Sequence, residues 1–181
     1  MSDIWLILLM GFLLLITVED IRVREVSIIW FMAVLIISLI FQSRTDLTIK
    51  EILLNILVNL GVVFIQWLAV TIYFSLKQKK FVNISSEYLG WGDMLFLVSV
   101  ACLLSPLNFI SFLISSLIFT FILWLIILAF RRGKISTIPL AGIQSLFLFV
   151  VLIIIVASNK VSILNNDAIL IKSVSTYVGI G

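Results

Sequence analysis

Apolar residues form long, nearly unbroken runs along the chain, separated by short polar stretches. Six runs stand out: Ile4–Val18, Val26–Phe41, Ile52–Leu76, Tyr88–Leu104, Phe109–Phe130 and Ile138–Ser158. An apolar helix of roughly 17–25 residues spans about 30 Å of hydrocarbon, so the runs predict six transmembrane helices, the first two of them short. Unbroken runs do not show the alternating segments of a strand barrel. We therefore expect an all-α fold, a polytopic bundle of about six transmembrane helices.

Composition supports the same class of protein. Of the 181 residues, 63% are hydrophobic and 12% are charged, and the mean hydropathy is +1.33. This leaves too little polar surface to solvate a globular domain, so the bilayer is an expected partner. We assign residues 1–158 to the six-helix domain. The tail, 159–181, has spaced apolar residues, and we expect it to lie on the membrane as an interfacial helix.

The distribution of Lys and Arg predicts the orientation of the bundle. Eight of the twelve basic residues fall in the loops after helices one, three and five, and four fall on the other side. The positive-inside rule places these three loops in the cytoplasm. The first residues, Met1-Ser2-Asp3, have no positive charge, and no cleavage site follows the first run. We therefore expect a retained first helix and not a secretory signal.

Two acidic residues lie at the predicted cytoplasmic boundary. Asp20 ends the first helix and Asp93 lies near the start of the fourth, and these helices run in opposite directions. An ionisable group at membrane depth is a functional candidate by default. Two carboxylates held close together do not easily both ionise, so one stays protonated while the other accepts a proton from water. This is the arrangement that an aspartic protease needs.

Other kinds of catalytic site are excluded by residue type. Cys102 is the lone cysteine and the chain has no histidine. A Cys/His metal cluster, a Cys–His or Ser–His nucleophile pair and a disulfide framework are therefore ruled out. We expect no metal, no cofactor and no nucleic acid partner, which leaves the carboxylates as the catalytic candidates.

The residues alone leave alternatives for each acidic position. Asp20 precedes two arginines, Arg22 and Arg24, and an acidic residue at a helix end often has only a structural role. Glu19 competes with Asp20, because adjacent helical positions point about 100° apart and periodicity does not choose between them. The alternative function is a non-enzymatic polytopic membrane protein, transporter-like or an assembly subunit. In it, Asp20 and Asp93 form structural ion pairs with Arg22, Arg24 or Lys134.

Neighbouring residues have similar alternatives. Gly90 and Gly92 allow a tight backbone at the start of the fourth helix and close approach of another chain, but glycines are also common where membrane helices pack. Asn55, Asn59 and Gln66 share a face of the third helix. We expect them to form interhelical hydrogen bonds, with contact to a substrate as the less favoured alternative.

Three short motifs resemble those of the type IV prepilin peptidases. Asp20-Ile21-Arg22-Val23-Arg24-Glu25-Val26-Ser27 is similar to the D-x-R-x-R-x-I-P segment of that family, and Gly90-Trp91-Gly92-Asp93 matches its G-x-G-D. The stretch from Lys134 to Gly142 looks like its K-x-x-x-I-P-F-x-P segment. The order and the six-helix layout also agree, so the resemblance covers essentially the whole chain.

The resemblance implies an aspartyl endopeptidase embedded in the cell inner (cytoplasmic) membrane. Such enzymes cut the short basic leader from prepilin-like precursors at the cytoplasmic face, typically after a glycine. By motif position, Asp20 and Asp93 would be catalytic, and Gly90, Gly92 and Pro139 would bind substrate. The chain is similar to the short, peptidase-only form without paired C-x-x-C motifs, so N-methylation of the product would need another enzyme.

The sequence departs from the family pattern in three places. Ser27 stands where Pro is usual, and Leu140-Ala141 breaks the F-x-P pattern after Pro139. Leu95 stands where the family often has Lys. This last change removes a cation that would tune Asp93 or hold substrate, so it bears on the substrate class more than on the chemistry.

Overall fold

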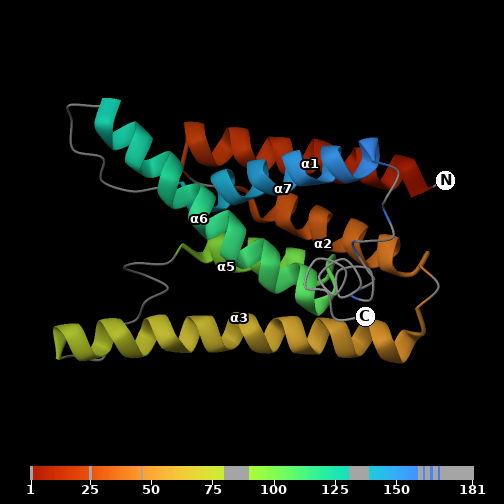
Figure 1. Ribbon diagram of the computed structural model, residues 1–181, viewed down its shortest axis with the longest axis horizontal. Helices are drawn as coiled ribbons and strands as arrows, with labels where there is room; N and C mark the ends of the chain where they lie inside the picture. The colour runs from red at the N-terminus through yellow and green to blue at the C-terminus, as the bar shows by residue number, and fades with distance from the viewer. Residues whose placement is uncertain are drawn as a thin grey trace, which may run out of the picture.

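The computed structural model describes residues 2–24, 26–45, 47–79, 90–130, 139–158, 161, 164 and 167. Its six helices, labelled as in Figure 1, are α1 (Ser2–Arg22), α2 (Ile28–Gln42), α3 (Ile49–Gln78), α5 (Trp91–Ala101), α6 (Pro106–Phe130) and α7 (Leu140–Ala157). No strand occurs in these ranges. The predicted all-α fold is confirmed, and each apolar run overlaps one helix.

The helices differ in whether they are long enough to cross a bilayer. Four of them, α1, α3, α6 and α7, are long and apolar enough to do so. The other two, α2 and α5, have 15 and 11 residues. At 1.5 Å per residue, α5 extends only about 16 Å, roughly half of the hydrocarbon thickness. The helix expected over Tyr88–Leu104 is therefore shorter in the structure, because the chain leaves the helical conformation at Cys102.

The turn between α5 and α6 lies inside the bundle. Residues 102–105 are at most 6% exposed, and irregular backbone at membrane depth needs partners within the protein. The Nδ2 of Asn59, on α3, donates to the carbonyl oxygens of Ala101 at 2.9 Å and Leu104 at 2.7 Å. The Gln42 amide of α2 donates to a further turn carbonyl at 3.1 Å. The interhelical role predicted for Asn59 is thus confirmed.

The tail contributes only three described residues. Leu164 is buried, and its carbonyl oxygen accepts a hydrogen bond from the Ser105 N–H at 2.9 Å. The interfacial helix expected over 159–181 otherwise falls outside the described residues. The polar sequence of residues 77–89, between the third and fourth helices, predicts a segment that becomes ordered when a substrate binds, and residues 80–89 lie outside the described residues as well.

Packing of the helices brings three helix ends together. The α1 helix packs along α7 and α2, α2 packs along α5, and α6 packs against α7. In Figure 1, α3 lies along one side of the bundle, where it contacts mainly α5 and α6. The C-terminal end of α1 and the N-terminal ends of α5 and α7 lie at the same end of the bundle. Asp20 lies at the C-terminal end of α1, and Asp93 lies at the N-terminal end of α5.

Candidate active site

The two aspartates meet at the first turn of α7. The Gly142 N–H donates to Asp20 Oδ2 at 2.5 Å, and the Ala141 N–H donates to Asp93 Oδ1 at 2.8 Å. These donors are consecutive amides of one helix, and consecutive Cα atoms are about 3.8 Å apart. The two accepting oxygens therefore lie within about 9 Å of each other. The structure brings together the two carboxylates that the topology predicted to share a membrane face.

The start of α7 attracts carboxylates for a physical reason. The first N–H groups of a helix have no partner within the helix, and they form the positive end of its dipole. Pro139 is the N-cap residue of α7 and makes no side-chain capping bond. Asp20 and Asp93 supply the missing acceptors, as anions commonly do at helix N-termini. Their positions are therefore fixed by backbone groups.

Gly142 allows Asp20 to come this close to α7. A Cβ atom built on Gly142 would lie 2.9 Å from both Cβ and Oδ2 of Asp20, closer than real contacts allow. One turn farther along, Thr17 Oγ1 and Ser145 Oγ are hydrogen-bonded at 2.8 Å. Small residues on α7 thus permit close packing with α1. In the sequence, Gly142 is only the last residue of the third motif, and nothing there marks it as a site residue.

Glu19 and Asp20 point in different directions. Glu19 Oε2 accepts a hydrogen bond from the N–H of Ser27, the N-cap residue of α2, at 3.1 Å near the surface. Asp20 is only 9% exposed and faces α7. Of the two adjacent carboxylates that periodicity left open, Asp20 is the one that lies beside Asp93.

Different charges act on the two carboxylates. The charge of Asp20 acts on Asp93, whereas the charge of Arg24 acts on Asp20. Lys134, a possible ion-pair partner of either aspartate, lies outside the described residues.

The three residues expected to bind substrate surround Asp93 and the start of α7. Gly90 is the N-cap residue of α5, with φ −61° and ψ 139°, a conformation open to any residue. A Cβ atom added at Gly90 would lie 3.5 Å from Asp93 Oδ2, and one added at Gly92 would lie 3.5 Å from the Phe31 ring. Both are ordinary van der Waals contacts. Pro139 directly precedes α7 and is half-buried. Their contact with substrate stays a prediction.

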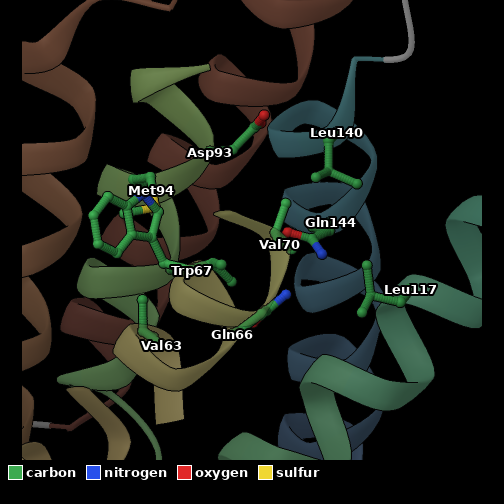
Figure 2. Close-up of a pocket in the computed structure, with 10 residues that line it drawn as sticks. Val63, Gln66, Trp67, Val70, Asp93, Met94, Leu117, Leu140 and Gln144 are labelled. Carbon is green, nitrogen blue, oxygen red and sulfur yellow. The ribbon is translucent and has the colours of Figure 1, made fainter. Parts of the chain in front are cut away.

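A small cavity begins at Asp93. Its volume is about 30 Å³, and it is lined by residues of α3, α5, α6 and α7. One water molecule needs roughly 10–15 Å³ of such space, so the cavity has room for one or two. In Figure 2, Asp93 lies at one end of the cavity, and Gln66 and Gln144 lie farther in. Asp93 therefore lies beside a space large enough for a water molecule.

Comparison of the chain with protein-family profiles, with curated proteins and with solved structures gives no match. The geometry of the site and the motif resemblance therefore carry the functional argument.

Proposed function

We propose that this protein is a membrane-embedded aspartyl endopeptidase that cleaves the leader of prepilin-like precursors at the cytoplasmic face. The observation that supports it best is the convergence of Asp20 and Asp93 on consecutive amides of α7, beside a water-sized cavity. The choice of precursor rests on the three sequence motifs. The expected substrate has a short basic leader followed by an apolar helix.

In the proposed mechanism, one aspartate is ionised and the other carries a proton. The ionised carboxylate removes a proton from water as the water oxygen bonds to the scissile carbonyl carbon, and its partner protonates the carbonyl oxygen. As this intermediate collapses and the carbon–nitrogen bond breaks, the aspartate that took the proton from water gives it to the leaving amine, and its partner takes back a proton from a hydroxyl of the intermediate. The two aspartates have different tasks in these steps, so both are required. No covalent intermediate is needed.

Cleavage by the purified protein in proteoliposomes tests the proposal. The substrate is a precursor with a basic leader and an apolar helix, and mass spectrometry of the product identifies the bond cut. We expect Asp20→Asn and Asp93→Asn each to abolish cleavage, because an amide keeps the shape but does not accept the proton. Glu19→Gln is the matched control and should retain activity. Full activity of either Asn variant would refute the dyad.

One observation favours the non-enzymatic alternative. Both aspartates accept hydrogen bonds from backbone amides at the start of α7, so they cap this helix whether or not they are catalytic. Asn caps helices about as well as Asp. If the role is only structural, the Asn variants should therefore behave like the wild type in every assay. If the role is catalytic, they should be folded and inactive.

A further inference from the structure

An extended peptide has no room beside the aspartates in the arrangement described. Asp20 is only 9% exposed, and its carboxylate lies against Gly142 of α7. The cavity at Asp93 has room for one or two water molecules. During cleavage, the scissile peptide bond must lie within hydrogen-bond reach of the catalytic carboxylates. One of the helices around the cavity therefore has to move before a precursor is cleaved.

Most of these helices are tied to one another by buried hydrogen bonds. Thr17 Oγ1 of α1 and Ser145 Oγ of α7 are 2.8 Å apart, and Ser99 Oγ of α5 donates to the Phe31 carbonyl of α2 at 3.1 Å. The α6 helix packs against α7. Buried hydrogen bonds are costly to leave unmade, so we expect α1, α2, α5 and α7 to move little.

The α3 helix is held firmly over only one part of its length. Asn59 bonds to two carbonyls at the turn after α5, and Val63, one turn farther along α3, is 5% exposed. These two are the buried residues of α3. Residues 66–78, which we call the end segment, contain no fully buried residue. Of the four helices long enough to cross a bilayer, α3 is the least buried.

The end segment makes a poorly satisfied contact with the rest of the bundle. Three of its polar atoms are shielded from solvent without a hydrogen-bond partner in the described part of the chain: Gln66 Oε1, the Trp67 indole nitrogen and Ser75 Oγ. Such groups destabilise the packed arrangement that encloses them. The cavity lies between this segment and the starts of α5 and α7 (Figure 2). Segments with few buried contacts open at the lowest free energy, so α3 is the helix to move.

The neighbour α6 does not hold the last turns of α3 in place. The two helices are in contact, but in Figure 1 α6 crosses the bundle, and its C-terminal end lies on the far side from α3. The end segment of α3 therefore has less support than the part near Asn59.

We propose that the end segment is a gate for the precursor. It swings away from α5 and α7, about the point where Asn59 holds α3, and the apolar helix of the precursor enters the space beside Asp93. The side chains that then face this helix are mostly apolar, among them Val70, Met94 and Leu140. The inference rests on the proposed function and names the route by which its substrate reaches the aspartates.

The required movement is modest. Val63 and Leu76 are 13 residues apart, which is about 20 Å at 1.5 Å per residue. A tilt of about 30° displaces Leu76 by about 10 Å, and this is the width of one helix.

Reversible crosslinking of the full chain in proteoliposomes tests this proposal. In a Cys102→Ala background, Val70→Cys with Leu140→Cys places thiols on two walls of the cavity, and a short bifunctional methanethiosulfonate joins them. We expect the crosslink, counted by mass spectrometry, to lower precursor cleavage by about 10-fold or more, because cleavage follows the fraction of protein that opens. A reducing agent should restore the activity.

Val63→Cys with Leu97→Cys is the matched control. Both residues line the same cavity, but they join α3 to α5 near Asn59, where the proposal requires no movement. This crosslink should leave cleavage unchanged. Undiminished cleavage by the crosslinked Val70–Leu140 protein would overturn the gate, and an equal loss in the control would overturn the pivot at Asn59.

Spin-label distances measure the opening directly in an Asp93→Asn protein, which should bind the precursor without cutting it. Labels at the exposed positions Leu76 of α3 and Val18 of α1 should move apart by about 10 Å when a saturating precursor is added. Labels at Leu60, next to the pivot, and at Leu8 of α1 should keep their distance. An unchanged distance between Leu76 and Val18 would refute the movement. If the wild type cleaves no precursor, the proposed function fails; if it cleaves while the crosslink and the labels show no opening, only this inference fails.

Discussion

Gly142→Ala tests whether close packing of α1 and α7 positions the catalytic pair. The added Cβ would lie 2.9 Å from Asp20 Cβ and Oδ2 and 3.3 Å from its Cγ, while ordinary contacts begin at 3.4 Å. Asp20 or α7 must therefore move by about half an ångström or more. This movement breaks or lengthens the bond from the Gly142 N–H to the carboxylate.

The expected size of the effect follows from two opposing contributions. Overpacking a tight interface destabilises by about 1–3 kcal/mol, and replacing Gly by Ala within a helix stabilises by about 0.5–1 kcal/mol. We expect a net loss of roughly 1–2 kcal/mol, seen as a midpoint of thermal unfolding a few degrees lower. Activity should fall much more, by about 100-fold, because misplacing a reacting group by about 1 Å has that effect.

Gly11→Ala in α1 is the matched control. Nothing lies within 4 Å of a Cβ added at Gly11, so this variant should be as stable as the wild type or slightly more stable, with full activity. The measurements are precursor cleavage in proteoliposomes and thermal unfolding of the same preparations. A Gly142→Ala protein with wild-type cleavage would show that the contact between Asp20 and α7 is not needed for activity.

Three further predictions follow from the described contacts. Asp93→Ala should lower the midpoint of thermal unfolding more than Asp93→Asn, because only Asn still accepts a hydrogen bond from the Ala141 N–H at the start of α7. Equal midpoints would show that Asp93 does not cap α7. Glu19→Gln should retain most cleavage, because its side chain reaches the Ser27 N–H and not α7; a loss as large as that of Asp20→Asn would mean that the wrong carboxylate was chosen. Asn59→Leu should destabilise by about 2–4 kcal/mol, because two buried carbonyls lose their donor; an unchanged midpoint would contradict this account of the turn.

The fold class was predictable from the length of the apolar runs, but the helix ends were not. The first apolar run ends at Val18 and its helix was predicted to end at Asp20, yet α1 continues to Arg22, because a charged residue ends a hydrophobic run without ending a helix. The fourth run was predicted to continue to Leu104, yet α5 ends at Ala101. Residues 102–104 are apolar and continue the run, and the sequence does not show that the amides of Asn59 and Gln42 supply donors to carbonyls of the turn.

The site was predictable in part. Opposite helix directions placed Asp20 and Asp93 at one face, and the structure brings them together. The contribution of α7 was not predictable, because it depends on how closely α1 approaches Gly142. Periodicity also grouped Asn59 with Gln66, since both lie on one face of α3. Their depths differ, so Asn59 meets the carbonyls of a turn and Gln66 meets a cavity.

Helix capping and proton transfer are compatible roles for these aspartates. An ionised carboxylate can accept about four hydrogen bonds. A backbone N–H of α7 occupies one acceptor position at Asp20 Oδ2, and another N–H of α7 occupies one at Asp93 Oδ1. The Gly90 backbone also donates to the Asp93 carboxylate, and the positions that then remain on the two carboxylates are available for water and for a proton. Because the donors are backbone amides of a packed helix, they also fix the orientation of both carboxylates before substrate arrives, which is what a catalytic pair requires. Structural contact with α7 therefore does not count against catalysis, and the decisive comparison is an Asn variant that keeps the cap but does not accept the proton.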